Sequence, residues 1–202
     1  MKKLTFFICA GICLLSLSAA AQITYGLKAG AMLSNTITLD EGEIDFTNTD
    51  PKLSYLAGGF VLLSFSEKLS LQPELLYVNK GGGKLEDEGA FSDNSYLHYL
   101  SLPIMLQYEV VSKLKLGAGP EFSYLLDVGE SERSGIKDLD IAVNAGFSYA
   151  LFQRWLVDLR YSLGVYDISE EFRWADPNDP LAFDAKTINR SLQLSVGWKL
   201  GR

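Results

Sequence analysis

LSLQPELLYVNKGGG, at residues 69–83, carries the pattern that decides the fold. Apolar side chains alternate with polar ones along it: Leu69, Leu71, Leu75 and Tyr77 against Ser70, Gln72 and Glu74. A period of two predicts a β-strand with one apolar and one polar face. Pro73 stands inside that strand, although proline has no N–H to donate to a ladder. We therefore expect a β-bulge or a missing ladder bond at Pro73, shared with Pro103 and Pro120 on the next two strands.

The same alternation recurs to the end of the chain, in stretches at 24–37, 55–65, 97–108, 113–127, 139–151, 155–168 and 188–200. The connections between the predicted strands are alternately long and short. Short turns on one side and long loops on the other are typical of outer-membrane barrels, whose short turns face the periplasm. The sequence thus predicts an all-β fold, an eight-stranded antiparallel up-and-down transmembrane β-barrel.

The two faces of these strands differ in a way that favours a membrane. The second face is rich in glycine and carries few charges, with Gly30, Gly117, Gly146 and Gly197 among its residues. Glycine covers little surface against water, but it leaves room inside a narrow barrel. The apolar face carries aromatic residues near the strand ends, as in the girdles at membrane interfaces. A secreted soluble sandwich or a lipocalin-like barrel is the alternative.

The first residues predict export. Two lysines precede a mainly apolar run at 4–17, which is shorter than the roughly 20 residues that a spanning helix needs. Three alanines ending at Ala21 fit a cleavage site. We expect 1–21 to be a cleaved signal peptide and 22–202 to be the outer-membrane β-barrel domain. An uncleaved N-terminal anchor is the alternative.

The composition of the chain limits the classes of partner and the kinds of structure that can be expected. The chain has 25 acidic and 18 basic residues and a net charge of −7, which argues against nucleic acid. No later segment is apolar for long enough to span a membrane as a helix. Both cysteines, Cys9 and Cys13, lie in the predicted leader, so the exported barrel is expected to hold together without disulfides.

Several of these strands resemble the PorT-like outer-membrane β-barrel proteins of the Bacteroidetes. The similar stretches are LSLQPELLYVNKGG, YLHYLSLPIMLQY, KLGAGPEFSYLL and LRYSLGVYDIS, with YGLKAGAMLSN and LQLSVGWKL at the two ends. The resemblance implies an eight-stranded barrel in the cell outer membrane of a Gram-negative bacterium. PorT itself is an accessory of the type IX secretion system, but most members have no assigned activity, so the resemblance implies no specific one.

His98 is the only histidine and the one candidate for catalysis. Some outer-membrane barrels hydrolyse lipids with a lipid-facing pair of histidine and serine. Here Ser101 is three residues away and so on the opposite face, while Ser95 lies in a loop. An interfacial polar aromatic residue is therefore the favoured interpretation of His98, and no catalytic residue is expected.

Charged residues on the polar face are expected to meet inside the barrel. The predicted lumen charge network is Lys28, Glu74, Lys115, Glu121, Asp140, Asp158, Arg160 and Lys199. An eight-stranded barrel is just wide enough for side chains to fill it, and a buried charge without a partner is costly. Mutual pairing of these acids and bases is favoured over the alternative, a path for conduction or for a ligand.

The predicted loops are acidic, with Asp40, Glu41, Glu43 and Asp45 in the first, Glu86, Asp87 and Glu88 in the second and two aspartates within 174–180. None has the spacing of a known calcium loop, so solvated turns are favoured over a metal site. The stretch KGGGK at 80–84 lacks the spacing of a phosphate loop and is interpreted as a flexible strand exit. We expect no metal and no cofactor.

These patterns predict a non-enzymatic outer-membrane protein with a structural or interaction role. It is expected to be a monomer in outer-membrane lipid, with acidic extracellular loops that meet an unknown partner. The alternatives are a secretion accessory by analogy with PorT, a small channel, and a lipid-modifying barrel enzyme that uses His98.

Overall fold

The computed structural model describes residues 22–39, 47–48, 51–81, 96–128, 137–168 and 186–200. The predicted signal peptide at 1–21 lies outside the described residues, as do the acidic loop segments at 40–45, 86–88 and 174–180. No helix in the described part of the chain is long and apolar enough to cross a membrane.

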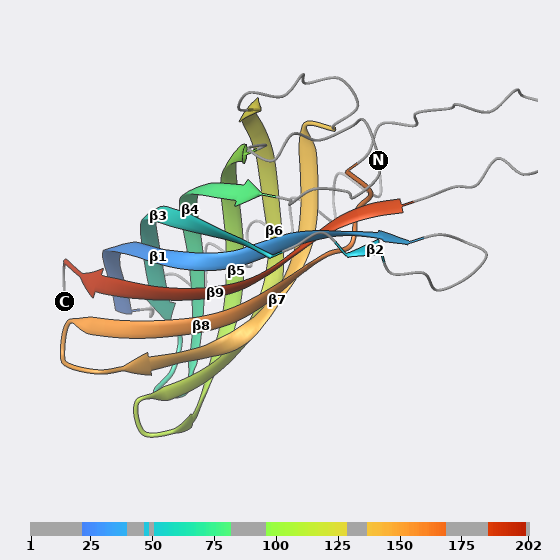
Figure 1. Cartoon of the computed structure of the whole chain (residues 1–202). Helices are drawn as coiled ribbons and strands as arrows, with labels where there is room; N and C mark the ends of the chain where they lie inside the picture. Colours follow the sequence, from blue (N-terminus) through green and yellow to red (C-terminus); the bar gives the residue numbers. More distant parts are fainter. Residues whose placement is uncertain are drawn as a thin grey trace, which may run out of the picture.

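The described chain is built from β-strands that close into a barrel (Figure 1). The strands are β1 (Gln22–Leu39), β2 (Thr47–Asn48), β3 (Lys52–Ser64), β4 (Leu69–Gly81), β5 (Tyr96–Val111), β6 (Leu114–Val128), β7 (Leu139–Ala150), β8 (Trp155–Gly164) and β9 (Lys186–Lys199). Each long strand pairs antiparallel with the next, and β1 also pairs with β9, which closes the sheet. The two-residue β2 pairs only with the loop-side end of β1. The prediction of an eight-stranded antiparallel all-β barrel is therefore confirmed.

One predicted strand is shorter than expected. The stretch at 155–168 is a strand only as far as Gly164. Beyond it, the backbone N–H groups of Val165 and Tyr166 both donate to the carbonyl oxygen of Ile141, at 2.8 and 3.3 Å. Two successive N–H groups that share one acceptor cannot continue the alternating ladder of an antiparallel pair, so β8 ends there.

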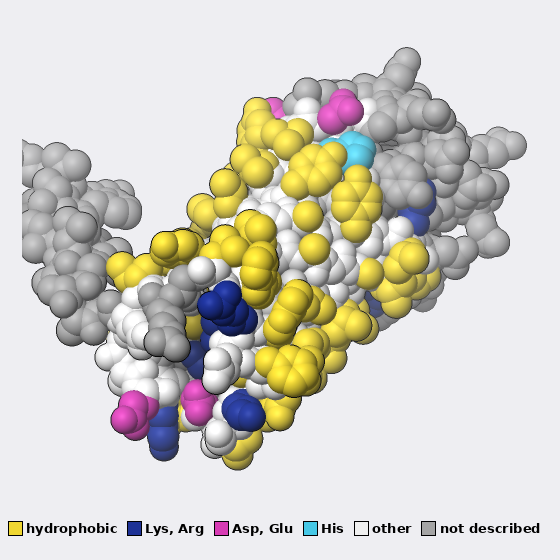
Figure 2. Space-filling model, turned by 90° about the vertical axis from the view of Figure 1, so that its left-hand side faces the viewer, with side chains coloured by type: hydrophobic (Ala, Val, Ile, Leu, Met, Phe, Trp, Pro, Cys, Tyr) yellow, Lys and Arg dark blue, Asp and Glu magenta, His cyan; other side chains and the backbone are white. Residues whose placement is uncertain are grey.

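Apolar side chains face outward and polar side chains face inward, the reverse of a water-soluble barrel. On β9, Leu194 is 55% exposed, whereas its neighbours Gln193 and Ser195 are 5% and 4% exposed. Figure 2 shows hydrophobic side chains spread over much of the wall in that view. Such alternation matches the lipid-facing and lumen-facing rows of a transmembrane barrel.

The ladder is interrupted at Pro73 without a bulge. On β3 and β4 the pairs run to Phe60↔Glu74 and resume at Leu63↔Leu71, so the register is unchanged while Pro73 has no paired residue on β3. The missing ladder bond expected at Pro73 is confirmed, and the bulge offered as its alternative is not formed. The proline has no N–H to contribute, and the constant register keeps every side chain on its own face.

The same kind of gap recurs on the next two strands. Between β4 and β5, no residue of β4 pairs with Pro103, and between β5 and β6, none of β5 pairs with Pro120. The register shifts of β5 lie elsewhere, between His98 and Tyr99 and between Glu109 and Val111. The irregularity is therefore shared by three consecutive strands, as the sequence predicts.

Candidate functional site in the barrel interior

Glu74, on β4, is the centre of a buried ion-pair cluster. Its Oε1 accepts from Lys28 Nζ on β1 at 2.7 Å, and its two oxygens accept from the Arg160 guanidinium on β8 at 2.5 and 2.9 Å. Asp158 completes the group through a short ion pair with Lys28 and a 3.6 Å contact with Arg160. We call Lys28, Glu74, Asp158 and Arg160 the Glu74 cluster. Its two acids balance its two bases, so each buried charge in it has a partner of opposite sign.

A second cluster forms around Lys80, the last charged residue of β4. Its Nζ lies 2.9 Å from Asp140 Oδ2 and 3.2 Å from Glu121 Oε1. Amide donors assist the carboxylates, since Asn144 donates to Glu121 at 2.7 Å and Asn189 donates to Asp140 at 3.0 Å. We call Lys80, Glu121 and Asp140 the Lys80 cluster. One base here serves two acids, so the cluster depends on Lys80.

Lys80 is the residue that sequence reasoning missed. The interpretation of 80–84 as a flexible strand exit is wrong for its first two residues, because β4 continues through Gly81. Glu74 and Lys80 are six positions apart on one strand, and alternation places both on the same face. The even spacing between Glu74 and Lys80 is the sequence signal for the lumen position of Lys80. The run of glycines that follows Lys80 is instead typical of a strand end.

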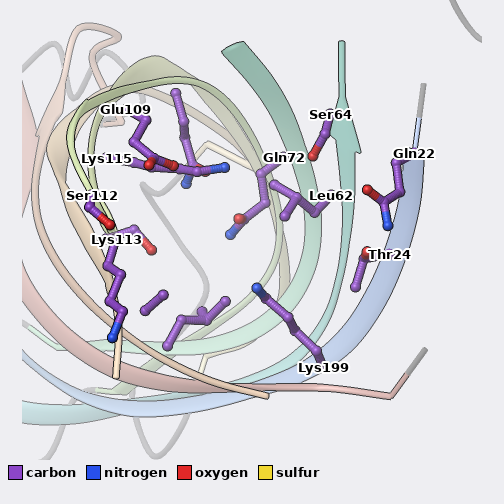
Figure 3. A pocket seen from close by; sticks show the side chains of 14 residues that line it. Gln22, Thr24, Leu62, Ser64, Gln72, Glu109, Ser112, Lys113, Lys115 and Lys199 are labelled. Carbon is purple, nitrogen blue, oxygen red and sulfur yellow. The ribbon is translucent and has the colours of Figure 1, made fainter. Parts of the chain in front are cut away.

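The eight residues predicted for the lumen fall into three places. Lys28, Glu74, Asp158 and Arg160 form the Glu74 cluster, and Glu121 and Asp140 join Lys80. Lys115 and Lys199 belong to neither cluster and instead line a cavity at the short-turn end (Figure 3). Lys115 donates to Ser70 Oγ at 2.9 Å.

Apolar side chains occupy part of the space that the charges leave. Phe60, Leu62 and Leu156 form one buried group, which we call the Phe60 cluster. Lys28 Nζ lies 5.8 Å from the centroid of the Phe60 ring, so this group adjoins the Glu74 cluster. Charged and apolar side chains from β1, β3, β4 and β8 therefore meet in this section of the lumen, which in an eight-stranded barrel is only wide enough for side chains.

His98 lies beside aromatic and amide groups rather than beside a nucleophile. Its Nδ1 lies 2.7 Å from Tyr77 Oη and 3.2 Å from Asn79 Nδ2, and its ring stacks on Tyr77 at 5.7 Å. Ser101 is buried on the other face, where its hydroxyl bonds Ser123 at 2.7 Å. Ser95 lies outside the described residues. Histidine and Ser101 are therefore not brought together, and the described part of the chain holds no metal-binding group of side chains.

Comparison with known proteins agrees with this architecture. A family model described as "Outer membrane protein beta-barrel domain" matches residues 18–170. No curated protein sequence is significantly similar to the chain.

The solved structures of similar shape described next are distant in sequence. The attachment invasion locus protein Ail of Yersinia pestis is 12% identical, with 88% of this chain and 98% of that chain covered and a TM-score of 0.48. Neisserial surface protein A is also 12% identical, with the same coverage and a TM-score of 0.49. OprG from Pseudomonas aeruginosa is 15% identical, with 89% and 95% covered and a TM-score of 0.40.

Proposed function

Because the chain belongs to the family of outer-membrane protein β-barrel domains, we propose that it is a non-enzymatic scaffold whose plugged barrel holds its loops at the cell surface. The protein is located in the outer membrane, where its outward apolar rows lie in lipid. The observation that supports the proposal is the interior, where two buried ion-pair clusters and the Phe60 cluster lie in the lumen. A filled barrel gives the loops a rigid base and offers ions no open path.

Conductance separates this function from that of a small channel. In planar bilayers the wild-type protein is expected to show no steady conductance. A variant that replaces Glu74 and Arg160 by Ala removes the paired side chains from the Glu74 cluster and should open a water-filled path. Glu67→Gln is the matched control, because Glu67 is exposed on the β3–β4 turn. Steady conductance by the wild-type protein would instead favour the channel.

The finer family assignment is also a proposal. The strand motifs shared with PorT-like proteins of the Bacteroidetes support it, and they make a role as a type IX secretion accessory worth testing. Disruption of the gene in the source bacterium, followed by an assay for exported proteins in the medium, tests that role. Unchanged export would contradict the secretion role and would be consistent with the scaffold function.

We further propose that the leader is cleaved before Gln22 and that the barrel is monomeric. Alanines that end at Ala21 support the cleavage site. Each long strand has a neighbour on both sides, which leaves no free edge for strand pairing with a second copy. The intact mass of the protein from outer membranes tests the first point, and its mass in detergent by light scattering tests the second.

A further inference from the structure

The barrel has a polar cavity at its short-turn end that the scaffold function does not use. Its volume is about 350 Å³. We call it the vestibule, and residues of eight strands and the β5–β6 turn line it: Gln22, Thr24, Leu62, Ser64, Gln72, Gln107, Glu109, Ser112, Lys113, Lys115, Ser148, Ala150, Leu156 and Lys199. Because short turns of outer-membrane barrels face the periplasm, the vestibule faces the periplasm too.

Apolar side chains border the vestibule on its inner side. Leu62 and Leu156 line it and belong to the Phe60 cluster, which adjoins Lys28 of the Glu74 cluster. Gln72 also lines it and donates to Glu74 Oε1 at 2.6 Å, so its side chain is held in place. A polar cavity with an apolar inner border and a hydrogen-bonded glutamine in its wall suits the binding of a small polar molecule.

The charge of the vestibule is opposite to that of the protein. Three lysines and one acid line it, whereas the whole chain has a net charge of −7. Lys115 is repelled by Lys199 and attracted by Glu109, its cross-strand partner on β5. Among the described residues, no carboxylate lies within 4.0 Å of the Nζ of Lys115 or Lys199. Within the described part of the chain, these two neighbouring ammonium groups therefore form no ion pair.

The side chains converge on the opening from opposite sides. Figure 3 shows Lys199 and Gln72 reaching toward the centre from different walls, with Lys115 on a third side. Lys115 uses one of its three N–H donors on Ser70, and the other two remain for a ligand. The Gln107 side chain and the Ser112 hydroxyl add further polar groups. This set is rich in donors and offers one acid, Glu109.

We propose that the vestibule binds a small oxyanion with two negative charges, of the phosphate or dicarboxylate class. Two negative charges relieve the repulsion between Lys115 and Lys199, which one charge would only partly offset. Several oxygen acceptors match the ammonium and amide donors on different walls. The volume admits an ion of this size but no larger macromolecule. The two ligand classes share this chemistry, and the experiment separates them.

Titration calorimetry on the protein purified from outer membranes in detergent tests the proposal. Inorganic phosphate and succinate are the two probes, each at about 0.1 M sodium chloride so that diffuse surface attraction is screened. We expect saturable binding of at least one probe, and the tighter one identifies the class. Lys199→Gln and Lys115→Gln should each weaken it about tenfold, because each removes a charge-assisted hydrogen bond.

Lys68→Gln is the matched control, since Lys68 is exposed on the β3–β4 turn at the same end of the barrel and does not line the vestibule. It should leave binding unchanged. Heat-modifiable gel migration verifies that each variant is folded, and if one vestibule variant fails to fold, the other carries the test. The proposal is overturned if neither probe binds, if Lys68→Gln weakens binding as much as the vestibule variants, or if chloride binds as tightly as the probes.

Discussion

Glu74 and Arg160 are 86 positions apart in the chain, yet their side chains meet across the lumen in a two-bonded ion pair of 2.5 and 2.9 Å. The pair joins β4 to β8, two strands that are not neighbours in the sheet. It therefore cross-braces the barrel from inside, where the backbone ladder links only adjacent strands.

Removal of the charge on Glu74 should destabilise the barrel strongly. Glu74→Gln leaves Lys28 and Arg160 with Asp158 as their only acid, and an uncompensated buried charge costs about 3–5 kcal/mol. Unfolding in urea, followed by heat-modifiable gel migration, measures the loss. The double variant Glu74→Gln, Lys28→Met restores the balance of charge and should recover part of the stability. Glu67→Gln on the exposed β3–β4 turn is the control, expected to change stability by less than about 0.5 kcal/mol. Equal stability of Glu74→Gln and Glu67→Gln would show that the cluster is not a brace.

The sequence predicts which side chains face the lumen, but it does not predict which charges pair there. Whether a side chain faces the lumen is local, because it depends on parity along one strand. Lys28, Glu74 and Arg160 could therefore be assigned to the lumen from spacing alone. Which charges pair depends on the stagger between strands, and no spacing within one strand encodes it. Lys80 pairs with Asp140, which is 60 residues away, and that contact needed the structure.

The vestibule also lay beyond sequence reasoning, for a related reason. A cavity is the space that packing leaves, so it depends on how far each side chain reaches across the lumen. Parity along the strands places Lys115 and Lys199 inside the barrel. It does not show that, among the described residues, neither ammonium group has a carboxylate within 4.0 Å. Lys115 and Lys199 are separated from both ion-pair clusters because they lie near the short-turn end of the barrel. There Ser70 is the hydrogen-bond partner of Lys115.

Loss of the Lys80 charge should also destabilise the protein, because Lys80 is the only base that pairs with Glu121 and Asp140 among the described residues. Lys80→Met removes the ion-pair partner of two buried carboxylates, at an expected cost of about 3–5 kcal/mol in the free energy of unfolding. Lys137→Met is the control. Lys137 is partly exposed and pairs with Asp167 at 3.5 Å, so its loss should cost no more than about 1 kcal/mol. If urea unfolding ranks the two variants in the opposite order, the assignment of the Lys80 cluster as a structural centre is wrong.

Replacement of His98 by Ala tests the non-enzymatic assignment. The nearest serine in sequence among the described residues is Ser101, whose hydroxyl is buried and bonded to Ser123 at 2.7 Å. A nucleophile must lie within hydrogen-bond reach of its base, so His98 has no partner there. Phospholipid hydrolysis by the purified protein should be the same for wild type and His98→Ala, at the level of the detergent blank. Tyr77→Phe, which removes the hydroxyl bonded to His98, should behave likewise. Activity in wild type that His98→Ala abolishes would make the protein an enzyme.

Substitutions at two glycines compare the tightness of packing inside the lumen with that on the outer face of the barrel. An added Cβ at Gly26 would overlap the Phe60 ring and the carbonyl oxygen of Trp198, and the backbone oxygen cannot move aside without disturbing the β1–β9 ladder. Gly26→Ala should therefore cost about 1–3 kcal/mol through overpacking. An added Cβ at Gly59 meets only the Gly26 carbonyl oxygen at 3.5 Å, an ordinary contact.

Gly59→Ala is thus the matched control on the neighbouring strand. It is expected to be neutral or slightly stabilising, because alanine restricts the unfolded chain more than glycine does. Urea unfolding of the two variants in the same detergent compares them directly. If Gly26→Ala is as stable as Gly59→Ala, the Phe60 ring does not require the space over Gly26.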